Sequence, residues 1–265
     1  MLQIESLYQT FNQGSINESH ALRGIDLHLP AKQFVTVIGS NGAGKSTLFN
    51  VIAGVFSPTR GRIILDGEDV SLWPEHKRAN LVGRVFQSPL KGTAASMTIA
   101  ENLTLAMLRK KTPGLRLGVS RARRNTLADM LAPLGLGLET RLDDPVALLS
   151  GGQRQAMTLI MASFSNPKIL LLDEHTAALD PGTAGRILEL TGEITNNQQL
   201  TTLMITHNMQ QALTFGTRTL MLHKGQIILD IDSDEREGMT VQGLVDKFSA
   251  ATPEALLDDE LLLSI

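Results

Sequence analysis

Several short stretches of this chain are continuously apolar and rich in β-branched residues, with glycine, proline or charged residues on either side. The clearest are Phe34–Ile38, Lys168–Leu172 and Thr201–Thr206. Runs of this kind are typical of strands buried on both faces, because neither face then needs polar side chains. The pattern therefore predicts an α/β domain whose central strands are covered by helices.

Turn-forming residues mark out a second group of strands, which are more polar. One predicted strand lies between two turns, and a later turn joins two strands into a hairpin. The predicted turns are Pro58–Gly61, Asp66-Gly67 and Lys224-Gly225. The predicted strands are Arg62–Leu65, Arg218–His223 and Gln226–Asp230. We therefore expect a small antiparallel β portion around residues 58–67 beside the main sheet, and a hairpin at residues 218–230.

Helical spacing dominates the rest of the chain. Thr47–Ala53 follows the first buried strand, and residues 89–165 carry helical patterns that Pro113-Gly114 and Pro133 interrupt. No repeat of fixed period is found, so a solenoid or a propeller is not expected. We predict one domain over residues 1–265, in which a core of residues 1–88 and 166–265 carries a helical subdomain of about residues 89–165.

The composition excludes several classes of function. The chain has 24 basic residues, 27 acidic residues and no cysteine. Nearly balanced charge argues against a protein that binds nucleic acid through its phosphates, and the lack of cysteine excludes disulfides, thiolate zinc sites and a cysteine nucleophile. No apolar run approaches the ~18 residues of a membrane-spanning helix, so we expect a cytoplasmic protein without a span of its own.

A glycine-rich loop follows the strand predicted at Phe34–Ile38 and fits the pattern G-x-x-x-x-G-K-[ST]. Between a strand and a helix this pattern binds phosphate, because glycines let backbone N–H groups turn toward the anion and the helix N-terminus is positively polarised. Lys45 is expected to contact the β and γ phosphates, and the Ser46 hydroxyl to bind Mg²⁺. The loop consists of Gly39, Ser40, Asn41, Gly42, Ala43, Gly44, Lys45, Ser46 and Thr47.

Three further motifs lie at the ends of predicted elements. Ser150, ahead of Gly151-Gly152-Gln153, is placed to cap a helix, Asp173-Glu174 ends the second buried strand, and His207 ends the third. Each has a plain structural interpretation, as a helix cap or a turn residue. Asp173 and Glu174 also suit phosphate chemistry, because a carboxylate at the end of a strand can hold the shell of a magnesium ion while its neighbour activates water.

In combination these motifs resemble the nucleotide-binding subunits of the ATP-binding-cassette (ABC) superfamily, over essentially the whole chain. Six motifs occur in the order of the family. They are the Walker A loop at Gly39–Thr47, the Q-loop at Gln87, the signature at Leu149–Gln153, Walker B at Ile169–Asp173 with Glu174, the D-loop at Ala178–Asp180 and the switch histidine His207. Phe11 matches the aromatic residue that stacks on adenine in this family, and Tyr8 is the alternative.

The resemblance implies a P-loop ATPase fold with a RecA-like core of the ABC type, acting on ATP with Mg²⁺. Ser46 and Gln87 would bind the metal directly, and Asp173 would bind it through water. Glu174 would act as the general base, and His207 would contact the γ-phosphate.

The same resemblance implies partners. In this family two copies hold ATP between them, so Ser150 and Gly151 of one copy complete the site of the other, and Asp180 is assigned to the same nucleotide. Transport requires separate permease subunits, which would hold the chain at the cytoplasmic face of the cell membrane, and an importer adds an extracytoplasmic solute-binding protein. The stretch D-E-H-T-A-A-L-D resembles a bacterial subgroup of small-solute importers, with tryptophan- or tyrosine-type uptake proposed for some members.

Other functions within the superfamily match this sequence less well. A soluble ABC ATPase of DNA repair, chromosome organisation or translation usually carries a coiled coil, a zinc module or two cassettes, and this sequence shows one compact cassette. A catalytically dead cassette would lack Lys45, Glu174 or His207, and all three are present. The ATPase of an exporter remains an alternative, because unfused cassettes serve both directions of transport.

One residue departs from the family pattern. The usual D-E-P-T after Walker B is D-E-H-T here, with His175 in place of proline. The hypothesis that we favour is that His175 replaces proline in a turn, stays neutral, and can be changed to proline without loss of ATPase activity. The alternative is that a hydrogen bond to the nearby carboxylates favours its charged form and makes the turn sensitive to pH.

Overall fold

A computed structural model describes residues 1–109 and 119–251, so the predicted break at Pro113-Gly114 lies outside the described residues. The chain divides into two units, one of Met1–Val82 with Leu200–Ile265 and one of Gly83–Gln199. The second unit contains the stretch expected as a helical subdomain, about residues 89–165, together with a strand before it and a strand and a helix after it.

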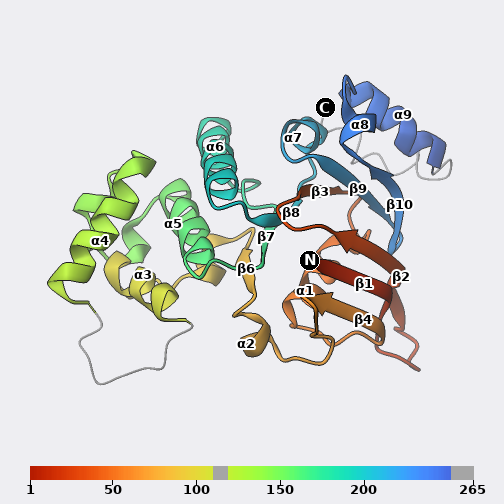
Figure 1. Cartoon of the computed structure of the whole chain (residues 1–265), viewed down its shortest axis with the longest axis horizontal. Helices are drawn as coiled ribbons and strands as arrows, with labels where there is room; N and C mark the ends of the chain where they lie inside the picture. The colour runs from red at the N-terminus through yellow and green to blue at the C-terminus, as the bar shows by residue number, and fades with distance from the viewer. Residues whose placement is uncertain (110–118, 252–265) are drawn as a thin grey trace. The chain divides into compact units, whose positions relative to one another are not determined.

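The first unit contains an antiparallel sheet with strand order β2-β1-β4-β5 (Figure 1). Leu2 pairs with Leu29 on one side and with Leu65 on the other, which places three buried leucines in one row. This sheet confirms the antiparallel portion that the turn residues predict. Its strands are β1 (Leu2–Phe11), β2 (Ser19–Leu29), β4 (Arg60–Leu65) and β5 (Glu68–Asp69).

A second sheet of this unit runs in the order β10-β9-β3-β8. Strand β3 (Phe34–Ile38) pairs in parallel with β8 (Thr201–Ile205) and with β9 (Arg218–His223), and β9 forms the predicted hairpin with β10 (Gln226–Ile231). Every residue of β8 and all but the first of β3 are buried. The continuous apolar runs therefore do mark strands that are covered on both faces.

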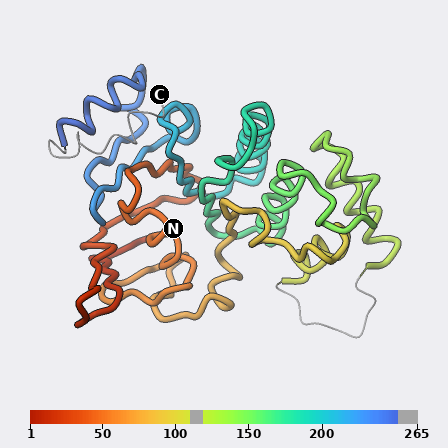
Figure 2. The backbone as a smooth tube through the Cα atoms, turned by 180° about the vertical axis from the view of Figure 1, so that it is seen from behind, coloured from red at the N-terminus to blue at the C-terminus, as the bar shows by residue number. Residues whose placement is uncertain are grey.

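The part of the first unit that the structure describes also contains five helices. Helix α9 packs beside α7 and the β9–β10 hairpin, as both views show (Figure 2), and Met209, Met221, Leu244 and Phe248 are buried together there. The helices are α1 (Lys45–Ala53), α2 (Glu75–Arg78), α7 (Met209–Thr214), α8 (Ser233–Arg236) and α9 (Val241–Ala251).

A buried arginine supports the C-terminal end of α1. Arg78 is 0% exposed and donates hydrogen bonds to the carbonyl oxygens of Val51 (2.5 Å) and Ile52 (3.1 Å), in the last turn of that helix. Its guanidinium also donates to the carbonyls of Ser71 and Trp73. A cation at a helix C-terminus satisfies unpaired carbonyls and opposes the negative end of the helix dipole. Arg78 therefore anchors the helix whose other end carries the phosphate-binding loop.

The second unit contains the helices α3, α4, α5 and α6 and the strand β7, which is the neighbour of β6 in its sheet. Capping boxes begin α3, through Thr98 and Glu101, and α5. No helix among residues 1–109 and 119–251 is long and apolar enough to cross a membrane. The elements are β6 (Val82–Val85), α3 (Ile99–Leu108), α4 (Arg121–Leu131), α5 (Gly151–Ser163), β7 (Ile169–Asp173) and α6 (Pro181–Asn197).

Candidate functional site

The loop after β3 has the backbone conformation that its glycines predict. Gly39, Gly42 and Gly44 have φ angles of 150°, 76° and 101°. A Cβ on Gly39 would lie 2.2 Å from the carbonyl oxygen of Leu222, and a Cβ on Gly44 would lie 2.6 Å from that of Ala21. The loop therefore passes too close to neighbouring backbone for a side chain at these two positions.

Lys45 and Ser46 begin helix α1 directly after this loop. The Nζ of Lys45 donates hydrogen bonds to the carbonyl oxygens of Gly39 (2.6 Å) and Ser40 (3.0 Å), so the side chain folds back over the loop. Ser46 is exposed, and the helix begins without a capping side chain or an acidic residue in its first turn. Such a helix N-terminus suits a bound anion.

The parallel register of β3 and β8 places His207 at the same edge of the sheet as the loop. Val37 is level with Ile205, so Gly39 and His207, each two residues further along, leave the sheet side by side. His207 is exposed. The first unit thus brings the phosphate-binding loop and the predicted switch histidine together.

The two aromatic candidates for stacking on a base have different surroundings. Phe11, at the end of β1, packs edge to face against Phe56, with ring centroids 5.2 Å apart. Tyr8 is 37% exposed and lines a pocket of about 460 Å³ with His20 and Arg60 among its other walls. The Arg60 guanidinium lies 5.6 Å from the centroid of the Tyr8 ring. This geometry does not choose between the two rings, so Phe11 stays a prediction.

In the second unit, Asp173 ends β7 in an ion pair that the sequence motifs did not predict. Nη2 of Arg84, in β6, lies 3.2 Å from Oδ2 of Asp173, and the two side chains are 12% and 14% exposed. The guanidinium also lies 4.5 Å from the ring centroid of Phe86. The signal available in the sequence was a charged residue inside a short apolar strand, because such a residue needs a partner when it is buried.

Glu174 follows Asp173 in an unusual backbone conformation. Its φ is 44°, in the left-handed region that residues other than glycine rarely adopt. The Nε2 of Gln87 donates to Oε2 of Glu174 at 3.3 Å. The second unit therefore brings the Q-loop glutamine and the two Walker B acids together at the end of one strand.

His175 corrects part of what the sequence suggested. Its side chain is 2% exposed, and Nε2 lies 3.0 Å from the hydroxyl of Thr191 in α6, so its partner there is not a carboxylate. Burial lowers the pKa of His175 from 6.5 to about 4, whereas an anionic partner would have raised it. The residue is neutral near pH 7, as the favoured hypothesis expects. It is nevertheless a buried, hydrogen-bonded side chain and not a simple substitute for proline.

The predicted cap Ser150 is confirmed at the start of α5. Its hydroxyl accepts from the backbone N–H of Gln153 at 3.2 Å, and the Gln153 side chain accepts from the N–H of Ser150 at 3.1 Å. A Cβ on Gly152 would lie 2.2 Å from Cγ2 of Thr183. The signature motif therefore packs closely against the first turn of α6.

Asp180 caps helix α6. Its carboxylate accepts from the backbone N–H of Thr183 at 3.0 Å, and the side-chain and backbone hydrogen bonds of Thr183 lower the pKa of the Asp180 carboxyl. Pro181 occupies the first helical turn, where proline is preorganised. This cap accounts for Asp180 structurally, and its contact with nucleotide stays a prediction.

The predicted metal ligands offer a hydroxyl, an amide oxygen and a carboxylate, which are donors that Mg²⁺ accepts. Among the residues that the structure describes, no three His, Cys, Asp or Glu side chains gather as a metal cluster. Mg²⁺ bound with a nucleotide needs few protein ligands, because phosphate oxygens and water complete its shell. The side-chain chemistry of Ser46, Gln87 and Asp173 is therefore compatible with a metal that arrives with its nucleotide, and their shared role as ligands stays a prediction.

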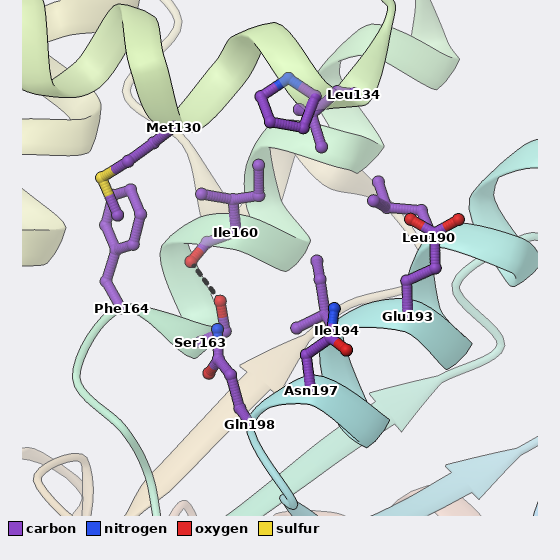
Figure 3. Close-up of a pocket in the computed structure, with 11 residues that line it drawn as sticks. Met130, Leu134, Ile160, Ser163, Phe164, Leu190, Glu193, Ile194, Asn197 and Gln198 are labelled. Atoms are coloured by element: carbon purple, nitrogen blue, oxygen red, sulfur yellow. Dashed lines mark hydrogen bonds between the residues drawn. The ribbon is translucent and has the colours of Figure 1, made fainter.

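A separate pocket of about 220 Å³ lies between α4, α5 and α6 of the second unit (Figure 3). Met130, Ile160 and Ile194 form apolar walls, and Glu193 contributes a carboxylate. None of the predicted site residues is among the side chains drawn there. The pocket is therefore distinct from the candidate nucleotide site.

Comparison with known proteins agrees with these motifs. A family model described as ABC transporter matches residues 22–177. A tyrosine transport ATP-binding protein of Clostridioides difficile is 44% identical over 251 residues, which cover 95% of this chain and 100% of that protein. The thiamine import ATP-binding protein ThiQ of Yersinia pseudotuberculosis is 37% identical, over 77% of this chain and 82% of its own length.

A solved structure supports the same conclusion. A dimeric ATP-binding cassette in a post-hydrolysis state, bound to ADP and Pi, matches with a TM-score of 0.75 and 26% identity, over 88% of this chain and 99% of that one. The match confirms the predicted α/β fold with a P-loop ATPase core of the ABC type. The chain belongs to the ABC transporter family, as one of its ATP-binding, ATP-hydrolysing subunits.

Proposed function

We propose that this chain hydrolyses ATP to drive the import of an amino acid or a related small solute through a membrane permease. The observation that carries the ATPase chemistry is the contact between Gln87 and Glu174, next to Asp173 at the end of β7. The solute class is supported by the similar tyrosine transport ATP-binding protein, whose whole length is matched by 95% of this chain.

Each unit supplies one part of the chemistry. In the first unit, the loop Gly39–Thr47 binds the phosphates, Lys45 stabilises the charge on the γ-phosphoryl group, and His207 contacts the γ-phosphate. In the second unit, Glu174 accepts a proton from the attacking water as the water oxygen bonds to phosphorus and the bond to ADP breaks. The transition state is loose, so positioning and charge stabilisation do most of the catalytic work.

Ser46, Gln87 and Asp173 would hold Mg²⁺ together with the nucleotide. When bound, the ion neutralises phosphate charge and helps to orient the reacting groups. Arg84 already pairs with the carboxylate of Asp173, so it reduces the negative charge that a cation meets there.

ATP binds between two copies of the chain, and Ser150 with Gly151 of one copy completes the site of the other. Glu174→Gln keeps the shape of the side chain but removes the base, so the variant should retain ATP and remain dimeric. Size-exclusion chromatography with light scattering, with and without Mg-ATP, measures this. A Glu174→Gln protein that is monomeric at saturating Mg-ATP contradicts the proposed dimer.

Phe11 stacks on the adenine ring. Stacking accepts any purine and contributes only ~0.5–1.5 kcal/mol beyond buried area, so GTP should compete within about tenfold of ATP. Phe11→Ala should weaken nucleotide binding without changing its dependence on Mg²⁺, and Tyr8→Ala is the matched control on the same strand. If only Tyr8→Ala weakens binding, Tyr8 is the stacking residue.

The permease docks on the helical subdomain, about residues 89–165, beside the Q-loop. Leu90 and Leu105 lie in this stretch and are 56% and 55% exposed, so both are accessible for an apolar contact with the permease. Docking would hold the chain at the cytoplasmic face of the membrane, and import would add a solute-binding protein on the far side. Leu90→Asp with Leu105→Asp should abolish co-purification with the permease, whereas Leu72→Asp, in the first unit, should not.

Uptake by cells tests the function as a whole. Deleting the gene should lower uptake of radiolabelled tyrosine or tryptophan, and wild-type protein should restore it while Glu174→Gln should not. Unchanged uptake with altered efflux of the same solutes would identify an exporter. Unchanged transport in both directions would contradict a role in transport of these solutes.

A further inference from the structure

The turn after β7 carries Glu174 in a conformation that has to be held in place. With φ at 44°, Glu174 lies where a residue with a Cβ is strained, and such residues persist only when the surrounding structure determines them. The carbonyl oxygen of Glu174 accepts from the N–H of Ala177 at 3.0 Å, which closes the turn locally. The side chains of Asp173 and Glu174 also contact Arg84 and Gln87, and the residue after Glu174 makes a further contact within the second unit.

His175 supplies such a contact. It follows Glu174 directly, is 2% exposed, and its Nε2 lies 3.0 Å from Oγ1 of Thr191. Thr191 is 0% exposed and belongs to α6, sixteen positions along the chain. The contact therefore joins the turn to the buried side of a helix.

The direction of this hydrogen bond follows from the protons available. The hydroxyl of Thr191 donates to the carbonyl oxygen of Ile187 at 2.7 Å, which uses its single proton. Its oxygen therefore accepts, and His175 donates from an Nε2–H. A neutral imidazole with its proton on Nε2 meets this requirement.

Helix α6 is a firm support for the contact. Asp180 caps its first turn, and the Thr195 hydroxyl donates to the carbonyl of Thr191 at 2.8 Å. Leu190 and Ile194, on either side of Thr191, line the pocket between α5 and α6 (Figure 3), whereas Thr191 is not among its lining residues. One side of α6 thus packs on α5, and another side carries Thr191, which accepts the hydrogen bond from His175.

We propose that His175 and Thr191 form a positioning pair, whose hydrogen bond holds the turn against α6 and so fixes the strained backbone of Glu174 and the aim of its carboxylate. The pair acts through Glu174 and touches no reactant itself. This inference rests on the proposed role of Glu174 as general base. The buried hydrogen bond supplies a tether that proline, without a side-chain donor, does not have.

The test compares three changes on α6 in the full-length protein. Thr191→Val keeps the side-chain shape but removes the acceptor, Thr191→Ser keeps the hydroxyl, and Thr195→Val makes the same change one turn later, away from His175. Single-turnover hydrolysis of Mg-ATP and its equilibrium binding are measured separately, at a temperature where circular dichroism shows every variant folded. We expect Thr191→Val to hydrolyse roughly tenfold more slowly with unchanged affinity for ATP, and the other two to stay near the wild-type rate.

A double-mutant cycle sharpens the result. His175→Phe removes the donor while keeping a buried ring, so its effect and that of Thr191→Val should not add, because both remove one interaction. Additive effects, a wild-type rate for Thr191→Val, or equal slowing by Thr195→Val or Thr191→Ser would each overturn the positioning pair. Glu174→Gln is run alongside. If Glu174→Gln hydrolyses at the wild-type rate, the proposed base is wrong, whereas an inactive Glu174→Gln with a normal Thr191→Val refutes only the pair.

Discussion

The phosphate-binding loop of the first unit and the turn at residues 173–176 of the second unit are both proposed to contact a nucleotide, but they obtain their shapes differently. The loop is shaped by its backbone, through positive φ angles at its glycines and close approach to neighbouring carbonyls. The turn is shaped by side chains whose partners are remote in the sequence. Asp173, Glu174 and His175 contact residues 89, 87 and 16 positions away, respectively.

This difference predicts how substitutions in each region affect the protein. A backbone-defined loop tolerates no Cβ at its closest approaches, so one methyl group there has a large effect on stability. In a turn held by side-chain pairs, one substitution removes one pair. Each substitution should then change one property, such as the Mg²⁺ concentration needed for nucleotide binding or the orientation of a carboxylate. We therefore expect sharp effects in the loop and graded effects around the turn.

The largest effect is expected from Gly39→Ala. Its Cβ would meet the Leu222 carbonyl oxygen at 2.2 Å, and we expect the free energy of unfolding to fall by about 3–5 kcal/mol. Gly42→Ala is the matched control, since its Cβ has no neighbour within 4 Å and only the strain of a positive φ remains, about 1 kcal/mol. Urea unfolding of the two variants measures the difference, and equal losses would show that close approach does not shape the loop.

A somewhat smaller effect concerns His175 and pH. Its pKa is about 4 in the folded protein and 6.5 in the unfolded chain, so the unfolded chain takes up a proton first as the pH falls. The contribution of neutral His175 is complete above pH 6.5 and is lost as the pH falls toward 4, by up to about 3 kcal/mol. His175→Gln lacks the group and should lose less stability over this window. Parallel stability curves for the two proteins, from urea unfolding at pH 7, 6 and 5, would contradict this.

The third prediction removes a charge beside the turn. Arg84→Met leaves Asp173 without its cationic partner, so we expect nucleotide to bind at about tenfold lower Mg²⁺, equivalent to ~1.4 kcal/mol. Binding of a fluorescent ATP analogue is titrated with Mg²⁺ to measure this. Arg84→Lys keeps the charge and should resemble wild type. A higher requirement for Mg²⁺ in Arg84→Met would instead make Arg84 a support for the carboxylate.

The smallest expected effect is that of removing a helix cap, and it distinguishes a cap that only stabilises its helix from one that also takes part in the ATP-dependent dimer. Ser150→Ala and Thr98→Ala each remove the cap of a capping box in the second unit, so each should cost about 1 kcal/mol of stability. Only Ser150→Ala should weaken the ATP-dependent dimer, measured by light scattering in the Glu174→Gln background. Equal weakening by Thr98→Ala would make the dimer defect a consequence of lost stability.

Local motifs predicted the local structure around several candidate site residues. Ser150 caps α5 because a serine followed three residues later by glutamine can satisfy two N–H groups reciprocally. The loop of the first unit follows from glycine spacing for a similarly local reason. The contacts of Arg84 with Asp173 and of Thr191 with His175 were not predicted, because no residue near Arg84 or Thr191 in the chain indicates these partners.

The sequence by itself determined the buried strands, the phosphate-binding loop and the helix caps, because each depends on residues that are close together in the chain. It also determined membership of the ABC family, because that depends on the order of such short motifs along the chain. Only the tertiary structure decided how the Walker B acids and His175 are supported. Whether a histidine in a turn is exposed and charged or buried and neutral depends on what packs over it, and here that is helix α6 with the Thr191 hydroxyl. Burial and partner choice arise from elements that meet only on folding, so no local pattern encodes them.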